Sequence, residues 1–414
     1  MDSNNIDTGK LRINVTGPEG IVPISDASIQ IANTGTPNTV LETINTDTNG
    51  NTETIDLAAP PIEYSMEPTD NQPYSEYNIR INAPGYSEQL ITGVQIFSTQ
   101  VGIQNIRLVP NPNEQDTYDP TVIGGHTLWE FYPPKIAEAE IKPLNESGEI
   151  VLRQVVVPET IVVHNGTPSD STAKDFYVPY LDYIKNVASC EIYSTWPEAT
   201  IQANVLAIMS FTLNRVYTEW YRNKGYNFTI TSSTAYDHKW MEGKTIYESI
   251  DRVVDSLYNN FLSRPNIKQP ILTQYCDGKR VSCPNWMTQW GSKALGDDGY
   301  KAIDILRYYY GSDMYINSAE IISGIPASYP GYNLTNGSSG EAVIQIQEQL
   351  NRIAQVYSAS PTINVDGIYG PATANAVKTF QKVFNLPQSG IVDYSTWYKI
   401  SEIYVGVSRI AELN

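Results

Sequence analysis

The sequence predicts a multidomain protein with an N-terminal antiparallel β-sandwich, a central α/β (α+β) domain and a small three-helix domain at the C-terminus. Its length of 414 residues exceeds one ordinary domain and allows roughly two to four. Apolar residues alternate with period two up to Leu108 and follow helical spacing after Pro179. Residues 1–150 carry a net charge of −15, whereas residues 151–414 carry only −3. We therefore divide the chain into segments 1–110, 111–175, 176–325 and 331–405.

Charge and composition exclude several classes of protein. The total charge of −18 opposes binding to a polyanion, so we expect no nucleic-acid partner. No stretch is long and apolar enough for a membrane span, and Met1–Lys10 lacks the basic start and apolar core of a signal peptide. We therefore expect no membrane span and synthesis without a secretory signal. The odd number of cysteines, 3, argues against a disulfide framework. For Cys276 and Cys283 three interpretations stay open: a disulfide pair, buried thiols or metal ligands.

Segment 1–110 has the alternation of half-buried strands. The apolar runs are Leu11/Ile13/Val15, Ile29/Ile31, Ile55/Leu57, Tyr77/Ile79/Ile81, Val94/Ile96 and Ile106/Leu108. Turn sequences such as Thr48–Asn51 and Pro84-Gly85 separate them, which predicts a small antiparallel sandwich. The order of these strands and turns resembles transthyretin-like modules, which serve as scaffolds in many contexts.

Segment 111–175 is rich in proline around β-branched stretches. It begins with Val109–Asn113 and includes Pro133-Pro134, Pro143 and Pro158. This composition is typical of an extended connector, which we interpret as either a passive linker or a pro-segment. If it is cut, we expect the cut near Arg153-Gln154 to Val157.

Segment 176–325 shows helical patterns. One begins at Pro179 and ends near Glu191. Ser194–Glu198 then supplies a cap candidate, a proline and an acid, which predicts a second, long helix with one buried stripe. Further helices are predicted over Tyr247–Phe261 and Tyr300–Tyr310, with a loop-rich stretch that contains strands between them.

Segment 331–405 carries a specific motif. It closely resembles the peptidoglycan-binding type 1 domain, which implies a small helical fold that binds peptidoglycan. The matching residues are Gly340, Val343, Gln347, Leu350, Asn351, Asp366, Gly367, Tyr369, Gly370, Pro371, Thr373, Ala376, Val377, Phe380, Gln381, Leu386, Pro387, Gly390, Thr396 and Trp397. The stretches Asp366–Thr373 and Ser389–Thr396 resemble each other, which predicts an internal near-duplication. Tyr369 and Gln381 are candidate sugar contacts, with core packing as the alternative for Tyr369.

The central segment resembles the stage II sporulation protein D family of lytic transglycosylases. Tyr183–Ala199 parallels the beginning of that family's motif, and Met287–Tyr310 parallels its end. The sequence departs from the family at Ser282–Trp286, where Gly-His-Gly-Val-Gly is usual. This departure weakens the case for the family's zinc site or histidine contact.

Taken together, the segments resemble the spore cortex-lytic enzymes of the SleC type. Asp237–Trp240 and Thr273–Pro284 also look like that group. The resemblance implies a germination enzyme that is stored in the spore, at the cortex or coat, as an inactive zymogen. It implies activation by a subtilisin-like protease and degradation of spore cortex peptidoglycan.

Glu191 is the candidate catalytic residue, on the position that it shares with the family. A lytic transglycosylase needs one carboxyl group that first protonates the leaving oxygen and then accepts the proton of the muramic 6-hydroxyl. The Glu191 carboxyl would need partial desolvation to hold that proton. The candidate substrate contacts are Gln289, Asp237, His238 and Trp286, and we expect neither a metal nor another cofactor.

Other interpretations stay open from the sequence. Glu191 also fits a solvated carboxylate past a helix end, Gln289 fits packing, and Asp237-His238 fits a hydrogen-bonded turn. A zinc amidase usually needs clustered histidines, yet His126, His164 and His238 are far apart in the sequence. A Cys/His peptidase lacks a family signature at any cysteine. A muramidase, or a wall-binding structural protein without activity, remains as an alternative.

Overall fold

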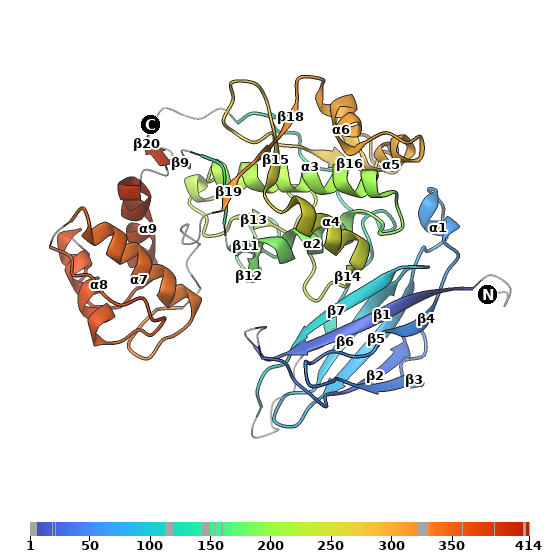
Figure 1. Ribbon diagram of the computed structural model, residues 1–414, viewed down its shortest axis with the longest axis horizontal. Helices are drawn as coiled ribbons and strands as arrows, with labels where there is room; N and C mark the ends of the chain where they lie inside the picture. The colour runs from blue at the N-terminus through green and yellow to red at the C-terminus, as the bar shows by residue number, and fades with distance from the viewer. Residues whose placement is uncertain are drawn as a thin grey trace.

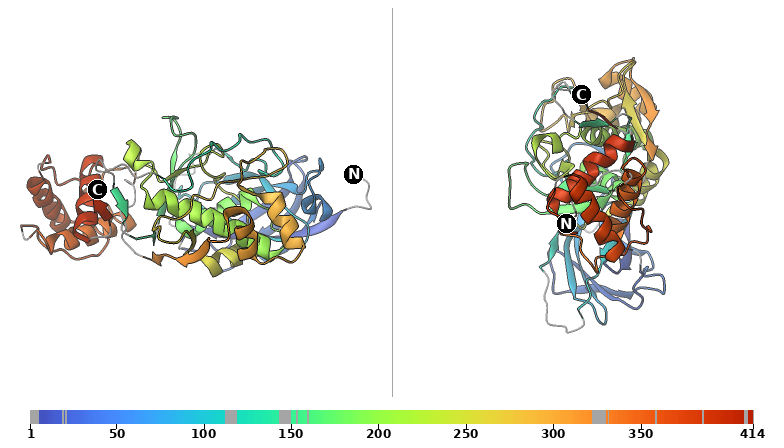
Figure 2. Two further views of the ribbon diagram at one scale, coloured as in Figure 1. Left: turned by 90° about the horizontal axis from the view of Figure 1, so that it is seen from above. Right: turned by 90° about the vertical axis from the view of Figure 1, so that its left-hand side faces the viewer.

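A computed structural model gives the fold (Figure 1). It describes residues 6–18, 20, 22–111, 119–142, 150–152, 154–158, 160–321, 330, 332–357, 359–384, 386–408 and 411–413. The protein is a multidomain α+β protein, with β strands near the N-terminus and helices near the C-terminus. The C-terminal helices lie at one end and the N-terminal strands toward the other, with a helical central part between them (Figure 2).

Two sheets form the N-terminal part. The first has the order β3-β2-β5-β6-β8 and the second has the order β14-β7-β1-β4. Their bounds are β1 (Asp7–Thr16), β2 (Ser28–Asn33), β3 (Val40–Asn45), β4 (Ile55–Ala59), β5 (Ser75–Asn82), β6 (Gln89–Ile96), β7 (Val101–Arg107), β8 (Thr121–Val122) and β14 (Ile246–Tyr247), with the short helix α1 (Glu63–Met66) after β4. Alternate residues of β1, β2 and β5 face a shared core.

The expected all-antiparallel pairing was wrong for two pairs of strands, β1 with β7 and β6 with β8. Strands β1 and β7 run parallel, with Leu11 opposite Gly102 and Val15 opposite Ile106. Period-two alternation reports which face of a strand is buried and not the direction of its neighbour. The alternation also missed β3, because that edge strand is mostly exposed.

Strand β14 comes from the central part and completes the second sheet. Ile246 and Tyr247 pair antiparallel with Ile103 and Gly102 of β7. Buried polar side chains hydrogen-bond across the same boundary: Thr245 Oγ1 donates to Gln104 Oε1 at 2.7 Å and Lys244 Nζ donates to Gln95 Oε1. The sandwich is therefore packed against the central part through main chain and side chains.

Helix α3 (Glu198–Tyr217) forms the centre of the central part. The sequence predicted one buried stripe, but buried residues lie on all sides of the helix because neighbours surround it. These neighbours are α2 (Tyr180–Glu191), α4 (Glu248–Leu257), α5 (Gln289–Asp297), α6 (Ala302–Tyr310) and β15 (Asn260–Ser263). The predicted starts of α2 and α3 are confirmed within a residue or two, whereas α5 was not predicted.

Short sheets surround these helices. A three-stranded sheet has the order β12-β11-β13, and the remaining strands pair two by two as β10-β19, β15-β18, β16-β17 and β9-β20. Their bounds are β9 (Ile150–Leu152), β10 (Val156–Val157), β11 (Thr160–His164), β12 (Asp175–Pro179), β13 (Ile230–Thr231), β16 (Tyr275–Cys276), β17 (Met287–Thr288), β18 (Tyr315–Ser318), β19 (Glu320–Ile321) and β20 (Ala411–Leu413), with the 3-10 helix η1 (Arg222–Lys224). Strand β11 therefore pairs with the central part, although it falls in the segment predicted as connector.

Residues 119–142 form an extended segment, which we call the strap. Apart from β8 it has no regular structure, and it runs from the sandwich across the central part. Ile136 N donates to Ala235 O at 2.7 Å, and Leu272 N donates to Glu140 O at 3.0 Å. The strap therefore lies against the central part, and the predicted domain boundaries stay a prediction.

The C-terminal part has a core shared by α7 (Glu341–Ala354), α8 (Pro371–Val383) and α9 (Tyr394–Ser408). Two buried glutamines repeat one hydrogen-bonding pattern. Gln347 Nε2 donates to Thr373 Oγ1 at 3.1 Å while its Oε1 accepts from Gly367 N at 2.9 Å. Gln381 Nε2 donates to Thr396 Oγ1 at 3.1 Å while its Oε1 accepts from Gly390 N at 2.9 Å. The near-duplication seen in the sequence is thus also present in the hydrogen bonds.

Candidate active site

Glu191 is the last residue of α2 and is 4% exposed. The helix ends there because Ile192 is extended. Glu191 Oε1 accepts a hydrogen bond from the backbone N of Lys239 at 2.8 Å. Glu191 Oε2 lies 3.3 Å from Thr127 Oγ1 and 3.3 Å from Gln289 Nε2. Neutral groups make these contacts, and among the described residues no cation forms an ion pair with Glu191.

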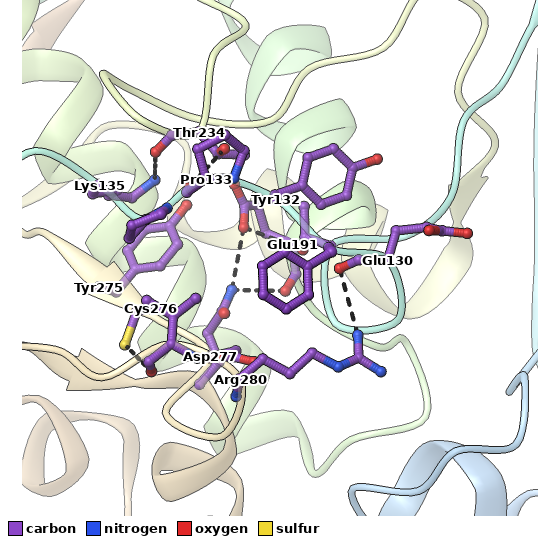
Figure 3. A pocket seen from close by; sticks show the side chains of 15 residues that line it. Glu130, Tyr132, Pro133, Lys135, Glu191, Thr234, Tyr275, Cys276, Asp277 and Arg280 are labelled. Atoms are coloured by element: carbon purple, nitrogen blue, oxygen red, sulfur yellow. Dashed lines mark hydrogen bonds between the residues drawn. The ribbon is translucent and has the colours of Figure 1, made fainter.

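A pocket opens at this carboxyl group (Figure 3). Five stretches far apart in the sequence form it: the strap, the end of α2, Thr234, β16 with the loop after it, and the start of α5. Its lining residues are Thr127, Glu130, Phe131, Tyr132, Pro133, Pro134, Lys135, Glu191, Thr234, Tyr275, Cys276, Asp277, Arg280, Val281 and Gln289. Phe131 is 80% exposed, so an aromatic ring stands open beside the carboxyl group.

Gln289 is held against Glu191 at the first residue of α5. Its Nε2 donates to Glu191 O at 2.7 Å, and its side chain is 2% exposed. The structure therefore brings together two predicted site residues from distant parts of the chain. The role predicted for Gln289, contact with substrate, stays a prediction.

The pocket also holds groups that the sequence did not single out. Tyr275 is buried, and burial, followed by the charge of Glu191, raises its pKa well above the usual value, so its hydroxyl keeps its proton. Lys135 Nζ lies 4.6 Å from the centre of the Tyr275 ring and donates to Asp237 O. Burial lowers the pKa of Lys135, and the charges of Glu191 and Asp237 oppose that shift. No spacing rule connects these residues, because they meet only in the fold.

A disulfide links Cys276, which lines the pocket, to Cys283. This settles the open question about the two cysteines. Within their loop, Asp277 accepts hydrogen bonds from the backbone N of Arg280 and of Val281, both at 2.9 Å. Arg280 Nη1 donates to Leu128 O of the strap at 3.1 Å. The loop is thus fixed at its base and bonded to the strap.

Asp237 lies behind the pocket and not in it. Its side chain is 0% exposed and pairs with Arg215 Nε at 2.7 Å. It also accepts from Tyr221 OH at 2.6 Å and from Thr231 N and Oγ1 at 2.9 and 2.7 Å. The prediction that Asp237 contacts substrate disagrees with this geometry, because its carboxylate is occupied by protein donors.

His238 is equally enclosed. It is 0% exposed, and its Nδ1 lies 3.1 Å from Tyr183 OH. Its Nε2 has no hydrogen-bond partner in the part of the chain that the structure describes. Burial, followed by the charges of Lys135 and Arg215, holds the pKa of His238 well below its usual value. A substrate contact by His238 is therefore also not supported, since packed rings cover the neutral imidazole.

The remaining predicted contacts lie away from Glu191. Trp286 is half-buried in the loop before β17 and does not line the pocket. Tyr369 is 0% exposed and donates to Gly390 O at 2.9 Å, as expected from the packing alternative. Gln381 is 0% exposed in the hydrogen bonds described above. Both side chains stabilise turns, so the sugar contacts predicted for them disagree with the structure.

The alternative nucleophile and metal sites gain no support. Cys190 is buried, and burial raises its pKa to about 11, which keeps the thiol protonated. Across the described ranges, no three His, Cys, Asp or Glu side chains gather in a way that would hold a metal ion. His126 and His164 are buried in separate surroundings, the latter 2.7 Å from Asp175. None of the described helices is both long enough and apolar enough to span a membrane.

Parts of the chain are similar to known proteins. A stretch of 70 residues is 40% identical to the zinc D-Ala-D-Ala carboxypeptidase of Streptomyces albus G and spans 17% of this chain and 26% of that protein. The chain thus covers about a quarter of that relative's length. The SleB N-terminal domain structure is 30% identical over 19% of this chain and 99% of its own, with a TM-score of 0.17. A minor pilin of Streptococcus agalactiae is 14% identical over 28% of this chain and 50% of its own, with a TM-score of 0.19.

These TM-scores are too low for either structure to contribute to an assignment. The family match is different, because it covers the helices α7 and α8, most of α9's N-terminal half and both glutamine patterns. Residues 339–400 match the family model described as "Putative peptidoglycan binding domain".

Proposed function

We propose that the protein is a lytic transglycosylase of spore cortex peptidoglycan, with Glu191 as its acid and base. The observation that carries the proposal is a buried carboxyl group, held by neutral donors, at the base of an open pocket. The peptidoglycan-binding family match at residues 339–400 supports the polymer, and the sporulation-protein resemblance supports the bond that is cut.

The hydrogen bonds distinguish the two oxygens of the Glu191 carboxyl group. Oε1 accepts from the backbone N of Lys239 at 2.8 Å. The Thr127 hydroxyl has one hydrogen, and its shorter contact, 2.9 Å, is to Cys190 O. Thr127 Oγ1 also lies 3.3 Å from Glu191 Oε2, the oxygen that we propose as the proton donor to the substrate. Gln289 uses one N–H for Glu191 O and the other for Oε2, which fixes the carboxyl plane.

The reaction follows from this arrangement. Glu191 Oε2 donates its proton to the glycosidic oxygen, and the bond to the muramic anomeric carbon breaks. The carboxylate then accepts the proton of the muramic 6-hydroxyl as that oxygen closes on the anomeric carbon. One carboxyl group performs both steps, so the second carboxylate of a retaining glycosidase is not required. Asp277, another carboxylate in the pocket lining, is occupied by backbone donors of its own loop.

Product analysis tests the reaction class. We expect cortex fragments treated with the protein to end in 1,6-anhydro-muramic acid, because no water enters the reaction. Mass spectrometry separates this end from the alternatives by mass. A reducing muramic end would show a muramidase, and a free lactyl group would show an amidase.

We also propose storage as a zymogen, with the strap as the blocking element. Thr127 Oγ1 contacts Glu191 Oε2 at the position that the glycosidic oxygen of the substrate must occupy in the proposed reaction. Arg280 donates hydrogen bonds to adjacent carbonyl groups of the strap. The predicted cut falls just after the strap. Arg153 lies outside the described residues, whereas Val155–Val157 are buried and β10 is paired with β19. A cut at Gln154 or before it leaves that pairing intact.

We expect the chain cut after the strap to release muropeptides at least about tenfold faster than the intact chain, because few intact molecules expose Glu191. The measurement compares initial rates before and after digestion at a specific protease site placed within residues 143–149. Equal rates would contradict zymogen control. A subtilisin-like protease of the spore is the proposed activator, and the cortex or coat region is the proposed location.

A wall-binding protein without activity is the second candidate, and the match at residues 339–400 favours it as much as it favours an enzyme. Binding to cortex sacculi with no change in their muropeptides, before and after the cut, would select this candidate.

A further inference from the structure

After the residues that line the Glu191 pocket, side chains of the central part hold the strap by hydrogen bonds to its backbone. Gln274 Nε2 donates to Ile136 O at 2.7 Å, while its Oε1 accepts from Glu138 N at 2.9 Å. Gln269 brackets Lys142 in the same way, accepting from its N at 2.6 Å and donating to its O at 3.3 Å. Side-chain amides thus replace the strand pairing that usually holds an extended segment.

Two arginines hold alternate carboxylates of the strap. Arg215 Nη2 and Nη1 donate to the two oxygens of Glu138 at 2.6 and 3.2 Å. Arg264 Nε and Nη2 donate to the two oxygens of Glu140 at 2.8 and 2.9 Å. Both pairs are two-pronged, the geometry in which arginine binds carboxylates most strongly.

The side chains that hold the strap are buried. The exposed fractions of Gln269, Gln274 and Arg215 are 4%, 2% and 1%. A buried amide or guanidinium left without a partner costs free energy, so departure of the strap creates a demand for a replacement ligand. That ligand must supply amide N–H and C=O groups in an extended chain, with carboxylates beside them.

We propose that the side chains beneath strap residues 136–142 bind the stem peptide of peptidoglycan once the strap has left, with Arg264 and Arg215 as its carboxylate receptors. The inference rests on the proposed function, in which the strap leaves and the glycan reaches Glu191. The strap continues from the pocket-lining residues Thr127–Lys135 to residues 136–142, so a peptide on a muramic residue in the pocket could follow the same line once the strap has left. Glu138 and Glu140 occupy the places of the peptide's carboxylates in the intact chain.

The test measures binding, and not turnover, in a Glu191→Gln background. The chain is cut at a protease site within residues 143–149, and two ligands are titrated by calorimetry: the disaccharide tetrapeptide of peptidoglycan and the same disaccharide without peptide. We expect Arg264→Gln to weaken binding of the first ligand about tenfold and to leave the second unchanged, because it removes two charge-assisted hydrogen bonds. Arg264→Lys keeps the charge but not the fork and should fall between.

Arg252→Gln is the matched control, since Arg252 is exposed on α4 and carries the same charge. We expect this variant to bind both ligands as the parent does, and the intact chain to bind the peptide ligand more weakly than the cut chain. Unchanged affinity in Arg264→Gln, an equal loss for both ligands, or no gain on cutting would overturn the inference. Product analysis of the active chain runs separately, so a missing anhydro end would contradict the proposed function and leave the binding result to be judged alone.

Discussion

Replacement of Glu191 by glutamine is expected to lower the release of anhydro-muropeptides by about 100- to 10,000-fold, the usual contribution of a positioned acid–base group. Glutamine keeps the size of the side chain and still accepts from Lys239 N, so the pocket should retain its shape. It cannot donate a proton to a leaving oxygen or take one from a hydroxyl. Initial rates on cortex fragments, followed by chromatography of the muropeptides, measure the loss in both the intact and the cut chain.

Glu198→Gln supplies the control. Glu198 lies only seven positions further along the chain, but it is exposed at the start of α3. Its carboxylate accepts from Gln202 on the same helix at 3.0 Å and does not line the pocket. We expect it to retain full activity. If Glu191→Gln released as much anhydro product as Glu198→Gln, the catalytic assignment would be wrong.

Replacement of Asp237 by alanine is expected to destabilise the central part by about 3–5 kcal/mol, because it leaves a buried guanidinium with one fewer partner. Asp237 and Arg215 are both 0% exposed at their side chains, 2.7 Å apart. The loss also removes the acceptor of Tyr221 OH and Thr231 N. Urea unfolding followed by tryptophan fluorescence measures the change in the free energy of unfolding.

A surface ion pair gives the comparison. Asp251 lies 2.7 Å from Lys185 but is 32% exposed, so Asp251→Ala should cost at most about 1 kcal/mol. An Asp237→Ala protein with unchanged stability but lost activity would contradict the structural role and restore the substrate contact that the sequence suggested. The two variants therefore separate the interpretations of the Asp237-His238 motif.

Local signals in the sequence predicted the elements and much less of the site. Pro179 and Pro197 mark the starts of α2 and α3 because proline fits a helix start and not its interior. Alternation located most strands of the sandwich for a similar local reason. Glu191 and Gln289 were chosen through a family resemblance, and their contact at 2.7 Å depends on where the fold places the end of α2 and the start of α5.

The errors at Asp237 and His238 have one physical cause. The sequence does not show whether a polar loop residue is bonded to water or to a buried arginine, because the fold determines its partner. The strap was missed for a related reason. Its prolines indicated an extended connector, and residues 131–139 have no helix or strand, but no local pattern says what lies beneath such a segment.

The pairing of β7 with β14 has a consequence for the order of synthesis. The edge of β7 becomes available once Arg107 has left the ribosome, whereas its partner begins only at Ile246. At ordinary rates of translation this interval lasts on the order of ten seconds. An uncovered edge invites pairing with another nascent chain, so the newborn N-terminal half is the stage at which this protein is most exposed to aggregation.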